Sequence, residues 1–160
     1  MPSAVELADG DVLLRPWTED EARAVGLTPA SPEIGRYFGP AFDAATAAPD
    51  PEAPAFAIVA GGVPVGRIWC AAHRRPFEVG YFLRPEAWGR GLATRSLLLV
   101  RDFLLAAGEE EVVLCTHPGN ERSQRVLRRA GFTPIGNAPA YLHIAGRWAD
   151  HRLFQVVDDR

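Results

Sequence analysis

The chain has 160 residues and a formal net charge of −3, and 48% of its residues are hydrophobic. This length and composition are typical of one globular domain, so we expect a single domain over residues 1–160 with its own core. The negative charge argues against a general nucleic-acid binder, which needs a basic face for the phosphates, and favours a small ligand or a cationic substrate.

The first part of the chain predicts one strand and two short helices. Residues 12–15 form an apolar run with the length of a strand. Thr18, followed three residues later by Glu21, has the capping-box pattern that begins a helix. A second helix is expected over residues 31–39, because Ser31 can cap it and the next residue is a proline, which suits the first helical position.

The central part predicts three strands that follow one another closely. Residues 56–60 and 65–70 are apolar runs separated by a segment that contains a Gly-Gly pair, a pattern that predicts a β-hairpin. Residues 77–83, with the sequence FEVGYFL, are expected to form the third strand.

After residue 91 the spacing of apolar residues becomes that of a helix. The expected buried stripe consists of Ala93, Leu97, Val100 and Leu104. Residues 109–117 then predict a strand, and residues 120–131 predict a helix closed by a glycine. Residues 140–157 predict a final hairpin that turns near Gly146. This order of elements predicts a mixed α/β domain with one central sheet.

The turn WGRGLAT, residues 88–94, joins the third central strand to the long helix. A strand that leads through glycines into a helix N-terminus presents unpaired backbone N–H groups and the positive end of the helix dipole. Gly89 and Gly91 would let the backbone approach a ligand closely, and Arg90 would add a guanidinium. The turn is predicted to bind an anion, above all a phosphate; the alternative is that the glycines only satisfy a tight turn.

Two well-known phosphate motifs do not fit this turn. A Walker A loop requires a lysine, and the chain contains none. The sequence GRGLAT nearly matches the dinucleotide fingerprint GxGxxG, but Thr94 stands where the third glycine should be. The acidic residues 109–111 also begin the next strand instead of ending it. A nicotinamide-dependent oxidoreductase is therefore disfavoured.

Three stretches, in the same order along the chain, resemble the GNAT acetyltransferase family in its branch of the ribosomal-protein N-terminal acetyltransferases RimJ and RimL. They are LLRPWTEDEA near the start, the run from Val79 to Phe132 that includes WGRGLA and NERSQRVLRRAGF, and GRWADHRLF near the end. The pyrophosphate signature of the family is Q/R-x-x-G-x-G/A. It matches at Gly91 and Ala93, whereas Trp88 replaces its first residue, a variant typical of this branch.

The resemblance implies a GNAT fold, which is a single α/β (α+β) domain. Its central sheet is mixed and mostly antiparallel, is splayed between its fourth and fifth strands, and has helices on both faces. Acetyl-coenzyme A is then the co-substrate: the turn holds its pyrophosphate, and its pantetheine arm pairs with backbone groups left unpaired on Phe82 and Arg84. The expected coenzyme A contacts are Phe82, Leu83, Arg84, Gly89, Arg90, Gly91, Leu92, Ala93, Thr94, Asn120 and Arg125.

Glu78 is the candidate general base for transfer to an amine. Side chains alternate along a strand, so Glu78, Gly80 and Phe82 are expected on one face. Val79, Tyr81 and Leu83 are expected on the other. In the fold that the resemblance implies, Glu78 would point toward the splayed strands. The alternative is an ordinary surface carboxylate. The resemblance also implies an oxyanion donor, a backbone N–H near Leu83.

The general acid that protonates the leaving thiolate has two side-chain candidates, Ser123 and Tyr141. The resemblance implies that the Ser123 hydroxyl lies near the sulfur and that Asn120 contacts coenzyme A, although Asn120 is also a plausible N-cap. Many relatives use a tyrosine where this chain has Phe132, and Tyr141 is the nearest substitute along the chain. Water is the third option. Arg125 belongs to a run of arginines that is either solvated or near the 3′-phosphate.

Both cysteines are expected to be reduced core residues, although Cys115 could approach the cofactor. Cys70 with His73 and Cys115 with His117 match no familiar zinc spacing, so no metal is expected. A Cys–His nucleophile is disfavoured because neither cysteine lies beside a clear orienting carboxylate.

The sequence as a whole predicts a cytoplasmic enzyme with no membrane or nucleic-acid partner. Its first residues lack the pattern of a signal peptide, and no run approaches the ~18 apolar residues of a membrane span. The predicted function is acetyl-coenzyme A-dependent transfer to a primary amine, on a protein N-terminus or a small molecule, by direct attack in a ternary complex. The predicted state is a monomer or homodimer. The alternative is a non-catalytic acyl-coenzyme A-binding or sensor module on the same fold.

Overall fold

The computed structural model describes residues 5–25, 53–71, 77–144 and 147–159. The helix expected over residues 31–39, His73 and the hairpin turn near Gly146 lie outside the described residues.

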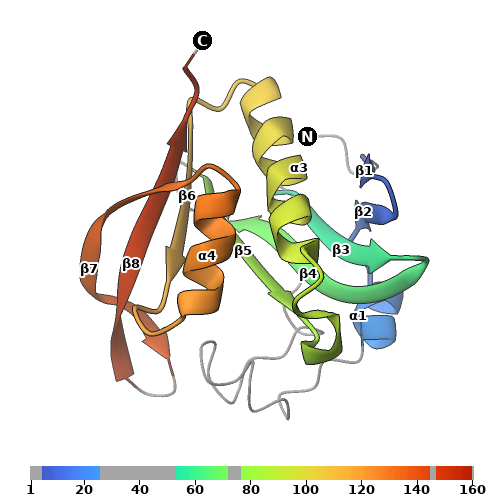
Figure 1. Cartoon of the computed structure of the whole chain (residues 1–160), viewed down its shortest axis with the longest axis horizontal. Coiled ribbons are helices and arrows are strands. Elements are labelled where there is room, and N and C mark those ends of the chain that lie inside the picture. The colour runs from blue at the N-terminus through green and yellow to red at the C-terminus, as the bar shows by residue number, and fades with distance from the viewer. Residues whose placement is uncertain (1–4, 26–52, 72–76, 145–146, 160) are drawn as a thin grey trace.

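One mixed sheet forms the centre of the described chain, with the strand order β1-β2-β3-β4-β5-β6-β8-β7 (Figure 1). The strands are β1 Leu7–Asp9, β2 Val12–Pro16, β3 Ala55–Ala60, β4 Val63–Ala71, β5 Phe77–Leu83, β6 Glu111–Thr116, β7 Thr133–Ile144 and β8 Arg147–Val157. Among these strands only β5 and β6 pair in parallel, and all other neighbours are antiparallel. This topology confirms the predicted mixed, mostly antiparallel sheet.

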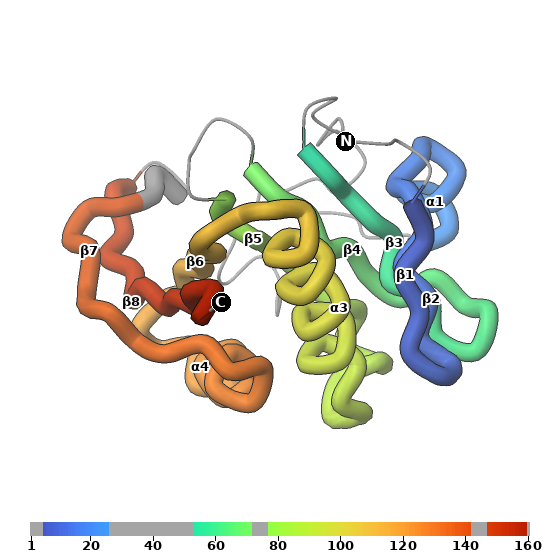
Figure 2. The backbone as a smooth tube through the Cα atoms, turned by 90° about the horizontal axis from the view of Figure 1, so that it is seen from above, coloured from blue at the N-terminus to red at the C-terminus, as the bar shows by residue number. Residues whose placement is uncertain are grey.

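Helices cover both faces of this sheet, as predicted. The described helices are α1 Glu19–Val25, the short 3-10 helix η1 Pro85–Ala87, α3 Leu92–Ala106 and α4 Glu121–Arg129. Figure 2 shows α3 and α4 on one side of the sheet and α1 on the other. The side covered by α3 and α4 is called the helix face below, and the side that carries α1 is called the α1 face.

Local sequence signals account for where these elements begin and turn. The Thr18 hydroxyl accepts a hydrogen bond from the Glu21 backbone N–H at 3.2 Å, which caps α1 as the sequence predicted. Gly61 and Gly62 join β3 to β4 with φ angles of 55° and 81°. Such positive φ angles at both central residues are what a tight two-residue hairpin requires, and glycine adopts them without strain.

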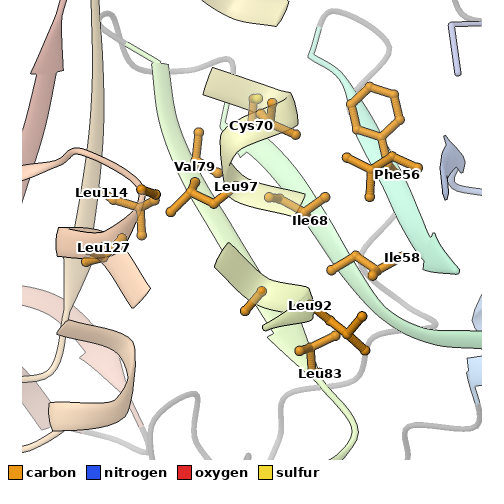
Figure 3. Close-up of a cluster of buried hydrophobic side chains, with 14 of the residues drawn as sticks. Phe56, Ile58, Ile68, Cys70, Val79, Leu83, Leu92, Leu97, Leu114 and Leu127 are labelled. Carbon is orange, nitrogen blue, oxygen red and sulfur yellow. The ribbon is translucent and has the colours of Figure 1, made fainter. Parts of the chain in front are cut away.

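The main core lies between the sheet and the helix face. The four residues of the predicted stripe on α3 are all buried, and Leu97, Val100 and Leu104 are fully so. Figure 3 shows Leu97 close to Val79 of β5 and Ile68 of β4, with Leu127 of α4 nearby. A second buried cluster on the α1 face contains Trp17, Ala22, Val25, Ala57, Val59 and Phe82.

Leu97→Ala is expected to lower the free energy of unfolding by about 2–5 kcal/mol, because it leaves a cavity in a close-packed region. Urea denaturation with a spectroscopic readout measures this change. Leu98→Ala is the matched control, since Leu98 lies on the same helix but is only partly buried. Equal losses in the two variants would contradict the assignment of Leu97 to the centre of the core.

Two strands differ from the expectation. β1 was not predicted, because three residues that end in Asp9 and a Gly10 turn give little alternation to detect. β7 begins at Thr133 instead of near residue 140. Its register against β8 shifts twice, and Ala140 has a φ of 48°, so the strand is too irregular for a period-two pattern.

Candidate active site

The sheet opens between β5 and β6. The two strands pair only at Phe77 with Val112 and at Glu78 with Val113. Beyond Glu78 they diverge (Figure 1), so residues 79–83 of β5 have no strand partner on this side within the described chain. We call this opening the splay. It exposes backbone hydrogen-bonding groups that a regular sheet would pair.

The backbone groups that face the splay belong to Tyr81 and Leu83. The Arg84 N–H donates to the Val65 carbonyl at 2.8 Å, so Arg84 points its backbone groups toward β4. In an antiparallel pair alternate residues point to the same neighbour, so Phe82 also points toward β4. The expectation that Phe82 and Arg84 present unpaired groups is therefore wrong. The Leu83 carbonyl already accepts from Trp88 Nε1 at 2.9 Å, which leaves the Leu83 N–H for a ligand.

The turn at the end of β5 has the geometry of an anion site. Gly89 and Gly91 both have a φ of 74°, and a Cβ added at either position would meet no atom within 4 Å. These positions therefore need glycine for their backbone conformation and border open space. Within the described chain, the backbone N–H groups of Leu92, Ala93 and Thr94 in the first turn of α3 donate no hydrogen bond. An anion at this turn would satisfy them.

Trp88 connects this turn to its surroundings. Its Nε1 donates to the Leu83 carbonyl, and the Arg122 guanidinium lies over its ring at 3.8 Å from the centroid. Such stacking is a favourable cation–π contact. Trp88 thus joins the end of β5 to α4. Arg125, one turn further along α4, keeps a side chain that is 60% exposed.

Glu78 lies at the point where the splay begins, and two side chains hold its carboxylate. The Tyr141 hydroxyl donates to Oε2 at 2.8 Å, and the Cys115 thiol donates to Oε1 at 3.0 Å. The Tyr141 ring lies 6.2 Å from that of His151, which is 3% exposed. The structure therefore brings Glu78 and Tyr141 together, although they are 63 positions apart in sequence.

The two cysteines have different environments. Cys70 is a core residue as expected, and burial raises the pKa of its thiol to about 12. Cys115 is only partly buried and lies beside the Glu78 carboxylate, so the expectation that it is a core residue without a neighbouring carboxylate is wrong. Within the described ranges no three His, Cys, Asp or Glu side chains group in a way that could hold a metal ion.

Ser123 lies on the other face of the sheet, beside Tyr81. Their hydroxyl oxygens are 2.8 Å apart, and burial raises the pKa of Tyr81 to about 12. Tyr81 therefore keeps its proton at neutral pH. The Asn120 Oδ1 accepts from the Ser123 backbone N–H at 3.2 Å, which confirms its interpretation as the N-cap of α4. The two acid candidates, Ser123 and Tyr141, are thus separated by the sheet.

Tyr81 is the residue at this site that sequence reasoning missed. From sequence alone, Tyr81 is only one of the apolar positions of β5. In the structure it packs against the core. Its hydrogen bond to Ser123 joins residues 42 positions apart, and no local sequence pattern predicts a contact between such distant residues.

A family model described as an acetyltransferase (GNAT) domain matches residues 11–133. A probable N-acetyltransferase of Bacillus subtilis, YjcK, is 32% identical over 81 residues, which cover 50% of this chain and 45% of that protein. The chain spans about half the length of the curated relatives it matches.

Solved structures share the fold over nearly the whole chain. The ribosomal-protein-S5-alanine acetyltransferase of Vibrio fischeri superimposes with a TM-score of 0.78 and 21% identity, covering 97% of each chain. The ribosomal L7/L12 α-N-protein acetyltransferase RimL, solved with coenzyme A, gives a TM-score of 0.79 and 17% identity over 97% of this chain and 99% of that one.

In the described residues, no helix is long and apolar enough to cross a membrane.

Proposed function

The chain belongs to the GNAT acetyltransferase family, and on this premise we propose that it transfers acetyl from acetyl-coenzyme A to a primary amine. The amine attacks the thioester directly, with both substrates bound together. The observation that carries this proposal is the splay, where β5 and β6 stop pairing after two residue pairs. The glycine turn with its open space and available amides follows at the end of the same strand.

The residues around the splay suit coenzyme A along its length. The amides of the first turn of α3, from Leu92 to Thr94, would bind the pyrophosphate. The amides of Tyr81 and Leu83 would pair with the pantetheine arm as a neighbouring strand would. Arg125 is proposed to contact the 3′-phosphate through its exposed guanidinium. Asn120 would contribute its side-chain nitrogen, because its oxygen caps α4.

Glu78 is proposed as the base that receives the amine proton, either directly or through water. The hydrogen bonds from Tyr141 and Cys115 hold the carboxylate at the entrance of the splay. An α-amino group with a pKa near 7.7–8.0 is neutral in about a tenth of molecules at pH 7, whereas a Lys amine is neutral about once in 2,500. A carboxylate is therefore a sufficient base for an acceptor of the first kind.

Ser123 is proposed as the acid for the leaving thiolate, on the opposite side of the thioester from Glu78. Its hydroxyl can pass a proton to the sulfur and recover one from Tyr81, which is protonated at neutral pH. Solvent then returns a proton to Tyr81 and accepts the amine proton from Glu78. The Leu83 amide would donate to the oxyanion that forms during attack. The amine thus approaches from the Glu78 side, and the thiolate is protonated from the Ser123 side.

Glu78→Gln is expected to slow transfer most at low pH and less as the pH rises. The Gln side chain keeps the size and hydrogen-bonding reach of Glu78 but cannot take a proton, and an amine that is already neutral no longer needs the base. The measurement is kcat/KM for one amine from about pH 6 to about pH 9.5 in both proteins.

Glu110→Gln is the matched control, because Glu110 is an exposed carboxylate that lies just before β6. It should follow the wild-type profile at every pH. A uniform deficit in Glu78→Gln across the pH range would mean that Glu78 only positions the substrate. No deficit at any pH would remove Glu78 from the site.

The acceptor is proposed to be a primary amine on a protein N-terminus or on a small molecule. The names of two structural neighbours support the first, since they describe acetyltransferases of ribosomal proteins. We propose that the protein works in the cytoplasm as a monomer or homodimer. A second candidate function, an acyl-coenzyme A sensor on the same fold, would use the turn and the splay without the proton-transfer residues.

A further inference from the structure

Arg67 is a buried cation in the second core cluster, on the α1 face of the sheet. Arg67 belongs to β4, and it is 3% exposed. The guanidinium carbon lies 4.9 Å from the centroid of the Trp17 ring and 5.1 Å from that of Trp69. The two rings offer cation–π contacts, which compensate only part of the cost of removing a charge from water.

No residue in the described chain neutralises this charge. Arg67 Nε is buried without a hydrogen-bond partner, and no carboxylate of the described residues forms an ion pair with the guanidinium. Burial lowers the pKa of Arg67 to about 10, and no acidic group among the described residues counteracts this shift. The side chain is therefore still charged at neutral pH. A buried charge is costly for a fold, and a fully buried arginine is uncommon unless it is paired.

Arg67 shares its face with the candidate base. In the β4–β5 register Arg67 lies opposite Phe82, Trp69 opposite Gly80 and Ala71 opposite Glu78. These pairs form one row, in which the Trp69 ring lies against Gly80; a Cβ added at Gly80 would come within 2.5 Å of it. Phe82 lies four positions after Glu78 on β5, which corresponds to about 13 Å along the strand. The row therefore carries a base at one end, an indole in the middle and a cation at the other end.

We propose that Arg67 selects an acceptor that carries an anionic group, a carboxylate or a phosphate, several bonds away from the amine it presents to Glu78. This inference rests on the proposed function, because it assigns Glu78 to the amine. The anion would pair with the guanidinium in a charge-assisted, bidentate manner, and the spacer would lie against Trp69. The net charge of −3 favoured a cationic substrate, whereas this local cation favours an acceptor with an acidic end.

The experiment compares acceptors that differ only in this group. The probes are 4-aminobutyrate and 6-aminohexanoate, their carboxamides, and an aminoalkyl phosphate of matched length. The wild-type protein should prefer the anionic form by about 10- to 100-fold in kcat/KM, mainly through KM, as expected for a hydrogen-bonded ion pair. The two anionic arms show whether carboxylate or phosphate is the better fit.

Arg67→Met should abolish this preference while leaving the carboxamides nearly unchanged. Met has a similar length and no charge, so the variant should keep or raise the melting temperature. Arg23→Met is the matched control, because Arg23 on α1 is 70% exposed and its loss should leave the preference intact. Equal KM values for acid and amide in the wild type, or a preference that survives in Arg67→Met, would overturn the proposal. So would a lower melting temperature of Arg67→Met together with an unchanged acid-to-amide ratio.

A binding measurement separates this inference from the proposed function and does not need a folded variant. The melting temperature of the coenzyme A-loaded wild type is recorded with hexanoate and with hexanamide, which lack the amine. Stabilisation by the acid alone would support the anion site even if no amine were ever acetylated. Equal effects of the two compounds would count against the anion site, even in an active enzyme.

Discussion

Gly91→Glu is expected to lower the affinity for coenzyme A by at least about 10³-fold, because a like charge about 4 Å from the pyrophosphate costs about 4 kcal/mol at a protein surface. The added carboxylate would enter the open space beside the first turn of α3. The backbone amides of that turn are the proposed pyrophosphate ligands. Isothermal titration calorimetry with coenzyme A measures this loss directly.

Two controls separate charge from backbone strain. Gly91 has a φ of 74°, so any side chain there is strained, and Gly91→Gln carries the same strain without the charge. Gly108→Glu carries a carboxylate at another glycine with a positive φ and open surroundings, beyond the far end of α3. Gly91→Gln should bind more tightly than Gly91→Glu, and Gly108→Glu should bind like the wild type. Unchanged binding by Gly91→Glu would show that the phosphates lie elsewhere.

Ser123→Ala is expected to lower kcat by about 10²- to 10⁴-fold, the range for loss of general-acid help, with little change in coenzyme A affinity. The substitution removes the hydroxyl that lies 2.8 Å from the Tyr81 hydroxyl but keeps the N-cap of α4, since the backbone N–H still bonds to Asn120. Steady-state kinetics with a saturating amine, together with calorimetry, separates the two effects.

Ser96→Ala is the control for this variant. Ser96 is fully buried on α3, and its hydroxyl has no hydrogen-bond partner within the described chain, so its loss should leave kcat unchanged. Tyr81→Phe should reduce kcat less than Ser123→Ala, because water can replace a proton donor that acts through another group. A kcat for Ser123→Ala within about twofold of the wild type would transfer the acid role to Tyr81 or water.

Regular local patterns made most of the fold predictable from sequence. α3 has a buried stripe at helical spacing, and α1, α4 and the β3–β4 hairpin each begin or turn at residues with a specific backbone role. The start of β7 at Thr133 was not predicted, because two register shifts against β8 interrupt the alternation of its side chains. The point where β5 and β6 stop pairing is set by tertiary packing, so only the family resemblance predicted it.

The site was predictable where its chemistry is local. The glycine turn could be interpreted from its sequence, because its positive φ angles and helix N-terminus follow from adjacent residues. The orientation of the β5 backbone groups could not, since it depends on which neighbour each residue bonds to, and Arg84 bonds to β4. The partners of Glu78 and Ser123 are contacts between distant segments, so the sequence named the two residues without showing that they lie on opposite faces.

Amine-dependent thiol release from acetyl-coenzyme A is the most direct test of direct transfer across the splay. The protein is mixed with acetyl-coenzyme A, with and without a panel of amines and peptides, while free thiol is followed and the intact protein mass is recorded. We expect thiol release only when an acceptor amine is present, with no acetylated protein formed in its absence. Tight coenzyme A binding without thiol release for any amine would favour the sensor module, and a burst of thiol with acetylated protein before amine is added would contradict attack in a ternary complex.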